Sequence, residues 1–212
     1  MNGDIKGKKL LDIGCGTGGL PIGLYNDFET ISAIDTNTEM LQIASNSTID
    51  KNINFRKISM LDIGSEFPTN FFDVVLCFGN TIVHLQNLKV IEIFFGEVKR
   101  VLKQGGRFLF QIINYDNVLD NKLSGLPTIE NELIKFERNY RLDENNLIDF
   151  STILTIKATR EVLCNNVKLF PARKNQLEAA LKNAGFHHVQ SYSSFAKTEY
   201  NPNSLPLVFE CQ

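Results

Sequence analysis

The order of expected strands and helices predicts an α/β fold with a doubly wound, Rossmann-like and mostly parallel seven-stranded sheet. Between about residues 8 and 113, apolar runs of strand length alternate with segments whose apolar residues recur at helical spacing. This alternation is typical of a parallel sheet with right-handed crossovers. The remaining chain has β-branched and aromatic runs between short polar turns. These predict a three-stranded antiparallel insertion and a terminal antiparallel hairpin.

The first half is expected to supply the parallel strands. A strand at 30–35 is followed by a helix at 37–46, which we expect to begin with a capping box of Thr36 and Glu39. The run at 107–113 is mostly apolar, as expected of a strand buried on both faces. The other expected elements are strands at 8–13, 53–58 and 72–78 and helices at 19–27 and 86–103, the last of them ended by Gly105 and Gly106.

The second half is expected to be largely antiparallel. After a loop at 117–130, the expected elements are meander strands at 134–142, 147–156 and 160–170, a helix at 173–184, and hairpin strands at 189–195 and 205–211. Residues 1–212 are therefore expected to form a single cofactor-binding domain. The loop and meander at 116–171 would be an insertion in it.

The composition excludes several classes of protein. Of 212 residues, 43% are hydrophobic and 22% are charged, and the formal net charge is −2, which provides no basic surface for nucleic acid. Four widely spaced cysteines indicate free thiols, not a disulfide framework or a metal site. No apolar run is long enough to span a bilayer. We expect a cytoplasmic protein without nucleic-acid, membrane or metal partners, and the oligomeric state stays open.

The glycine-rich turn after the first strand predicts a cofactor that carries a nucleoside. Glycines let a ligand approach the backbone, and Asp35 at the end of the next strand suits the two hydroxyls of a ribose. The glycines alone leave two cofactors open. Gly14, Gly16 and Gly19 fit the spacing of a nicotinamide dinucleotide site, whereas Gly18 in place of Gly19 gives a G-x-G-x-G turn.

Three further features favour the second turn. Asp12 would repel a pyrophosphate but could pair with an ammonium group. An acidic segment, Ser59-Met60-Leu61-Asp62-Ile63, follows the third strand, and the run 72–80 has the form of a fourth strand with its loop. With these features, the chain from about 8 to 114 resembles the class I S-adenosylmethionine-dependent methyltransferases. Two alternatives are a nicotinamide oxidoreductase and a non-catalytic cofactor-binding domain. The first is disfavoured because this sequence has no Tyr-x-x-x-Lys pattern for hydride transfer.

The resemblance implies S-adenosyl-L-methionine as cofactor and a set of residues around it. Asp12, Gly14 and Gly16 would surround the methionine portion, Gly18 would let the first helix pack closely, and Asp35 would bind the ribose. The other implied cofactor-binding residues are Cys15 and Phe78 in the loops beside the methyl donor, and Thr36, Met40, Asp62 and Ile63 around the adenine. For Met40 and Cys15 core packing is the alternative, and for Asp62 a turn-forming role.

The segments Phe78–Leu85 and Ile113–Leu119 resemble a narrower branch, which holds glycine and sarcosine N-methyltransferases and related small-molecule enzymes. In it, a Gly-Asn-x-x-x-His-Leu loop and an Asn-Tyr-Asp segment follow the fourth and fifth strands. The resemblance implies that Asn80 and Asn114 project toward the methyl group, although either could instead satisfy loop backbone. His84 could act as general base or cap the next helix.

The acceptor is expected to be a small molecule methylated at an amine nitrogen. Arg138 and Tyr140 share a strand face and could clamp a carboxylate, or they could belong to a solvated face. Enzymes of this family carry helices ahead of the first strand. Since the first expected strand begins at about residue 8, we expect either a truncated product or a cofactor covered by another element, such as the long loop after 113, or by a partner subunit.

Overall fold

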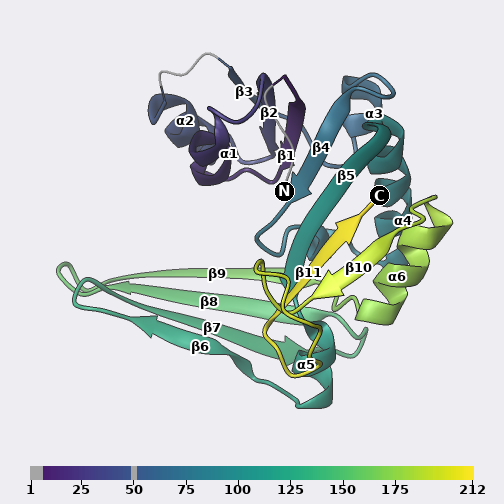
Figure 1. Cartoon of the computed structure of the whole chain (residues 1–212). Helices are drawn as coiled ribbons and strands as arrows, with labels where there is room; N and C mark the ends of the chain where they lie inside the picture. Colours follow the sequence, from purple (N-terminus) through teal and green to yellow (C-terminus); the bar gives the residue numbers. More distant parts are fainter. Residues whose placement is uncertain (1–6, 49–51) are drawn as a thin grey trace.

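Two sheets of different construction organise the chain, as the computed structural model of residues 7–48 and 52–212 shows (Figure 1). The larger sheet has seven strands in the order β10-β11-β5-β4-β1-β2-β3. Strands β1 to β5 pair in parallel, while β11 and β10 pair antiparallel beside β5. The doubly wound α/β fold and its terminal hairpin are therefore confirmed. A second, antiparallel sheet has the order β6-β7-β8-β9.

The bounds of the elements follow the predicted order. The large sheet contains β1 (Lys9–Ile13), β2 (Thr30–Asp35), β3 (Ile53–Lys57), β4 (Phe72–Cys77), β5 (Leu102–Ile113), β10 (Val189–Tyr192) and β11 (Pro206–Cys211). The helices are α1 (Gly19–Leu24), α2 (Thr38–Asn46), α3 (Ile63–Glu66), the 3₁₀ turn η1 (Ile82–His84), α4 (Leu88–Val101), α5 (Tyr115–Asp120) and α6 (Lys174–Asn183). The second sheet contains β6 (Gly125–Glu130), β7 (Ile134–Leu142), β8 (Ile148–Ile156) and β9 (Glu161–Leu169).

Two predicted element boundaries are wrong. Helix α4 ends at Val101, before the glycines, because the carbonyls of Arg100 and Val101 accept hydrogen bonds from the backbone that precedes β4. The chain then continues directly as β5, five residues earlier than expected. Helix α2 has Asn37 as its N-cap, and the Asn37 side chain accepts from the amide of Met40 at 3.0 Å. Thr36 therefore does not form the expected capping box.

The insertion has four strands where three were expected. The predicted loop at 117–130 contains most of α5 and the edge strand β6. Strand β6 contains Gly125 and Pro127, and its pairing with β7 shifts register between Leu126 and Ile129. Glycine and proline argue against a strand in sequence, yet an edge strand tolerates both because one side of it needs no partner.

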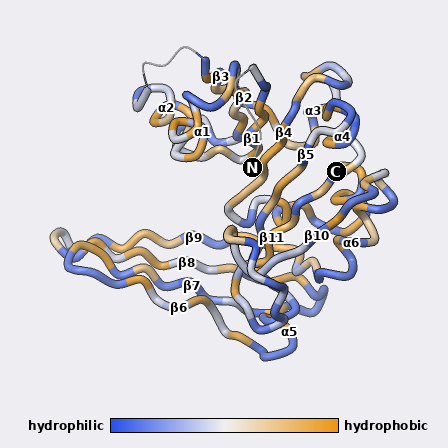
Figure 2. The backbone as a smooth tube through the Cα atoms, in the orientation of Figure 1, coloured by the Kyte–Doolittle hydropathy of each residue, from blue (hydrophilic) through white to orange (hydrophobic). Residues whose placement is uncertain are grey.

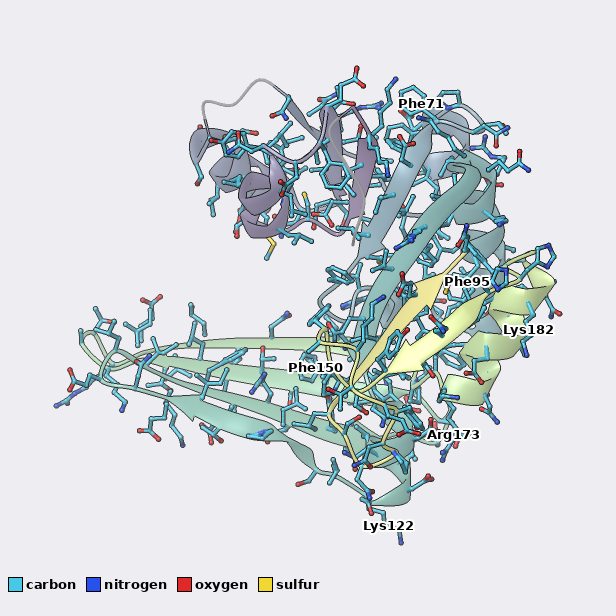
Figure 3. The ribbon with its side chains drawn as sticks, in the orientation of Figure 1. Phe71, Phe95, Lys122, Phe150, Arg173 and Lys182 are labelled. Carbon is cyan, nitrogen blue, oxygen red and sulfur yellow. The ribbon has the colours of Figure 1, made fainter. Side chains whose placement is uncertain are left out.

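Apolar side chains fill both faces of the large sheet. Its strands β1 and β4 and the second half of β5 are mainly hydrophobic (Figure 2). On the face covered by α4 and α6, the phenylalanines form a contiguous core, with Phe110 stacked 5.0 Å from Phe108 and 4.7 Å from Phe209 between ring centroids. Phe95 lies in this core (Figure 3). A smaller core packs α1 and α2 against the other face.

The second sheet is buried only where it joins the large one. The cross-strand neighbours Tyr140, Phe150 and Val167 pack against the large core, and Figure 3 shows Phe150 at this junction. Farther out on the same face, Phe136, Leu154 and Leu163 belong to neither core cluster. No helix in the described part of the chain is long and apolar enough to cross a membrane.

Candidate functional site

The glycine-rich turn between β1 and α1 is held by the end of β2. Gly14, Gly16 and Gly18 have φ values of 75°, 54° and 81°, which favour glycine. The backbone amide of Gly16 donates to Oδ2 of Asp35 at 2.9 Å. The amide of Asn37 donates to Oδ1 of the same carboxylate, also at 2.9 Å. Asp35 therefore fixes the turn, and each carboxylate oxygen has a further lone pair available for a ligand.

The three glycines are required for different reasons. A Cβ on Gly14 would lie 2.6 Å from Cγ2 of Thr81, and one on Gly18 would lie 2.9 Å from Cβ of Ala44. Packing within the chain thus excludes side chains at both positions. At Gly18 the close neighbours come from α2 and β3. The closest atom to a Cβ on Gly16 would be Sδ of Met40 at 3.8 Å, so the backbone of Gly16 is the one left open to a ligand.

A cavity of about 290 Å³ opens at the carboxyl ends of the parallel strands. It is lined by Ile13, Gly14, Asp35, Thr36, Ile58, Met60, Thr81 and His84. The structure thus brings four predicted site residues together: Gly14, Asp35, Thr36 and His84. Ile13, Ile58, Met60 and Thr81 were not predicted as site residues. Met60 and Thr81 lie inside the motif segments around Asp62 and Asn80, so nearness to those motifs was the available signal.

Asp12 is a buried carboxyl group whose charge is not compensated. Its side chain is 2% exposed, and Oδ2 has no hydrogen-bond partner. Burial, followed by repulsion from Asp35, raises the pKa of Asp12 from 3.8 to about 7. A carboxylate in such surroundings is stabilised by an incoming cation. The position therefore suits an ammonium group and is unfavourable for a phosphate.

His84 lies on η1 at the wall of the cavity. Burial lowers the pKa of this imidazole below its ordinary value of 6.5, so the ring is neutral at pH 7 and can accept a proton. The alternative role, capping the next helix, is excluded, because Asn87 is the N-cap of α4 and its side chain accepts from the amide of Val90 at 3.0 Å.

The side chains of Asn80 and Asn114 form hydrogen bonds within the chain, which is the alternative role given for them. The Asn80 side chain donates through Nδ2 to the hydroxyl of Tyr115 at 3.1 Å and accepts through Oδ1 from the amide of Ile113 at 2.9 Å. Asn114 is fully buried, and its Nδ2 donates to the carbonyl of Pro202 at 2.8 Å. Both amides hold loop backbone or neighbouring side chains, because each sits where a strand ends and unpaired backbone groups need partners.

The expected adenine-side residues are spread over the rim. Met40 is 42% exposed and lies over the turn beside Gly16, so it is not a core residue. Asp62 is exposed at the start of α3, and its side chain does not cap that helix. Ile63 is completely buried. None of Met40, Asp62 and Ile63 is among the residues that line the cavity.

Cys15 and Phe78 flank the same strand ends from the side of α1. Cys15 is 9% exposed, and burial together with the nearby Asp12 and Asp35 carboxylates raises the pKa of its thiol to about 12. Phe78 packs edge to face against Phe195, with 5.0 Å between ring centroids. Neither side chain lines the cavity. Both contact the smaller core cluster or belong to it.

The candidate acceptor residues on the second sheet are only partly available. The Arg138 guanidinium donates to the carbonyl of Pro127 at 2.6 Å. Tyr140 is 8% exposed and packs against Tyr115 and Phe150.

All four cysteines are free, and among the residues that the structure describes no three His, Cys, Asp or Glu side chains gather into a possible metal site.

Known proteins share both the sequence pattern and the fold. A family model described as a methyltransferase domain matches residues 11–110. The chain is 26% identical over 194 residues to glycine/sarcosine N-methyltransferase of Aphanothece halophytica. This alignment covers 90% of this chain and 71% of that protein. It is 32% identical over 114 residues to ubiquinone biosynthesis O-methyltransferase of Pseudomonas fluorescens (strain Pf0-1), with 52% of this chain and 47% of that protein covered.

Among solved structures, the fold is shared with an S-adenosylmethionine-dependent methyltransferase from Clostridium acetobutylicum ATCC 824. The two chains superpose with a TM-score of 0.81 at 17% sequence identity. The match covers 98% of this chain and 84% of the other. The similarity therefore extends over both sheets, including the antiparallel one that the family match at residues 11–110 does not reach.

Proposed function

Because this chain is a class I S-adenosylmethionine-dependent methyltransferase, we propose that it methylates an amine nitrogen of a small-molecule acceptor. The observation that carries the choice of nitrogen is the extent of the similarity. The N-methyltransferase relative aligns over 90% of the chain, whereas the O-methyltransferase relative aligns over 52%. Acceptor selectivity is expected to come from the part of the chain beyond the cofactor-binding half.

The residues at the strand ends fit the cofactor. The partnerless Oδ2 of Asp12 would receive the ammonium of the methionine portion, which would pull the carboxyl into its charged form. Asp35 would accept from the ribose hydroxyls while it keeps its bonds to the turn. The open backbone at Gly16, with Met40 beside it, would contact the rest of the cofactor. When bound, S-adenosyl-L-methionine supplies a sulfonium methyl group to an electron-rich acceptor atom.

His84 is the proposed general base. An ammonium has no lone pair until it loses a proton, and the neutral imidazole on the cavity wall can take that proton. The cavity wall of Thr81 and His84 would also hold the acceptor in line with the methyl group and displace water. Replacing His84 by glutamine is expected to reduce kcat/KM by about 10²-fold or more at neutral pH.

A panel of acceptors tests the proposal. Purified protein would be incubated with S-adenosylmethionine and matched amines, amino acids and phenols, and formation of S-adenosylhomocysteine would be followed. The proposal expects turnover with at least one amine and none with its hydroxyl isostere. Turnover confined to hydroxyl acceptors would overturn the choice of nitrogen. Binding of S-adenosylhomocysteine at a hundredfold its Kd should stabilise the protein by about 2.7 kcal/mol, and NADH should not.

Methylation of oxygen is the second candidate. It is favoured by the higher identity of the O-methyltransferase relative, 32% over 114 residues. A phenol needs the same proton transfer as an ammonium, so His84 would serve either acceptor. The acceptor panel separates the two candidates without further variants.

A further inference from the structure

The loop after β4 has an unusual backbone that is fastened to β5. Gly79 and Asn80 have φ values of 78° and 67°, a left-handed conformation that non-glycine residues seldom adopt. The amide of Asn80 donates to the carbonyl of Gln111 at 3.1 Å, and the amide of Gly79 donates to Oε1 of Gln111 at the same distance. The start of the loop therefore follows the position of β5.

The Asn80 side chain links this loop to the end of β5 and the start of α5. It accepts from the amide of Ile113 at 2.9 Å and donates to the Tyr115 hydroxyl at 3.1 Å. Tyr115 is completely buried at the first position of α5. This hydrogen bond is costly to lose, because the buried Tyr115 side chain would be left without a partner away from water. We call the Asn80–Tyr115 pair the clasp.

The loop that the clasp holds forms one wall of the cavity. Thr81 follows Asn80, donates through Oγ1 to the carbonyl of Phe78 at 2.7 Å, and packs against Gly14. The amide of His84 donates to the carbonyl of Thr81 at 3.2 Å, which begins the η1 turn. Thr81 and His84 both line the cavity, whereas neither residue of the clasp does. A shift of the loop would therefore move the cavity wall.

We infer that Asn80 and Tyr115 are positioning residues whose hydrogen bond fixes the loop of residues 78–84 against the glycine-rich turn and so shapes the methyl-donor cavity. The identity of the donor rests on the proposed function. The clasp also contacts the second sheet, because the ring centroids of Tyr115 and of Tyr140 on β7 lie 6.5 Å apart. The second sheet thus supports the loop through Tyr115.

Matched variants isolate the clasp. Tyr115→Phe removes only the hydroxyl, and Tyr140→Phe makes the same change in a buried neighbour whose hydroxyl has no partner. Asn80→Gly keeps the positive φ free of strain while it removes both side-chain bonds. Asn70→Gly is its control, because Asn70 has φ of 56° near the opposite end of β4. Asn80→Asp is the rescue, because its carboxylate can accept from both Ile113 and the Tyr115 hydroxyl.

The first readout is the calorimetric Kd for S-adenosylhomocysteine. We expect Tyr115→Phe to raise Kd roughly fivefold, Asn80→Gly by at least as much, and the double variant by no more than Asn80→Gly alone. Tyr140→Phe, Asn70→Gly and Asn80→Asp should stay within about twofold of the wild type. Wild-type affinity in folded Tyr115→Phe and Asn80→Gly, or equal losses in the controls, would overturn the inference.

Amide hydrogen exchange tests the clasp without any ligand. The amides of His84 and Leu85 are hydrogen-bonded within η1, and their exchange should quicken several-fold in Tyr115→Phe but not in Tyr140→Phe. Unchanged exchange would contradict the inference even if the wild type binds the cofactor product. If the wild type does not bind S-adenosylhomocysteine, the proposed function fails. The exchange measurement still decides whether the clasp holds the loop.

Discussion

The two sheets differ in how completely other elements cover them. The large sheet, which carries the cavity, is packed on both faces, whereas the outer half of the second sheet is not packed against a core. The large sheet has apolar cores on both faces, and its strand ends converge on a cavity. In the second sheet, the row Tyr140, Phe150 and Val167 joins the core. The neighbouring row on the same face, Phe136, Leu154 and Leu163, belongs to neither hydrophobic core cluster.

This contrast assigns different tasks to the two regions. The proposed cofactor site would depend on backbone geometry and two carboxylates, so it would need a rigid, fully packed support. Within the described residues, the second sheet reaches the site at its junction, where Tyr140 meets Tyr115 and where the amide of Phe170 donates to the carbonyl of Val83 at 2.8 Å. Variants in the two regions should therefore have effects of very different size.

The largest effect is expected in the phenylalanine core. Replacing Phe110 by alanine removes a fully buried ring that stacks on Phe108 and Phe209, so we expect a loss of about 3–5 kcal/mol in the free energy of unfolding. Urea denaturation followed by circular dichroism measures it. A loss below about 1 kcal/mol would mean that the large sheet is not the stable support that the comparison requires.

A pH-dependent effect is expected at Asp12. The folded protein retains a proton on this carboxyl up to about pH 7, whereas an aspartate with its ordinary pKa of 3.8 has already lost it. The ligand-free protein should therefore lose stability as the pH rises between these two values. Asp12→Asn cannot ionise. Relative to the wild type, it should gain on the order of 2–3 kcal/mol between about pH 5 and pH 8. Urea denaturation at both pH values measures this.

Asp27→Asn, at an exposed position, provides the control for Asp12. It should leave the pH dependence of the wild type unchanged. Equal pH slopes in the wild type and Asp12→Asn would show that Asp12 finds a partner in solution. The cavity end would then be electrostatically no different from the rest of the sheet.

A smaller effect in free energy, seen in binding, is expected at Asp35. Alanine removes the acceptors of the Gly16 and Asn37 amides and those proposed for the ribose, so Kd for S-adenosylhomocysteine should rise roughly tenfold or more. Glu39→Ala, in the first turn of the adjacent helix, is the control and should bind as the wild type does. Calorimetry that finds equal Kd values for the two variants would show that the ribose lies elsewhere.

The smallest effect is expected on the open half of the second sheet. Leu163 is 48% exposed and belongs to neither core cluster, so Leu163→Ala should change the free energy of unfolding by less than about 0.5 kcal/mol. Val167→Ala, in the row at the junction, should cost more because Val167 packs against the large core. Equal costs at both positions in urea denaturation would remove the distinction between the two halves of this sheet.

Local patterns in the sequence predicted the large sheet and the glycine-rich turn that we propose binds the cofactor. Strand and helix periodicity does not depend on distant partners, and the glycines before α1 need their conformation whatever surrounds them. Strand β6 escaped prediction because Gly125 and Pro127 are strand residues only at an edge, and an edge is defined by the neighbour β7. The end of α4 was misplaced because the backbone amides just before β4 donate hydrogen bonds to the last carbonyls of α4.

The sequence by itself determined that a glycine turn, Asp12 and Asp35 would meet at one end of a parallel sheet, since consecutive parallel strands end at the same edge. Only the tertiary structure decided what each group meets there. It placed Thr81 against Gly14, left Oδ2 of Asp12 without a hydrogen-bond partner, and bonded Asn80 to Tyr115. These outcomes depend on contacts between segments far apart in the chain, which no local pattern encodes.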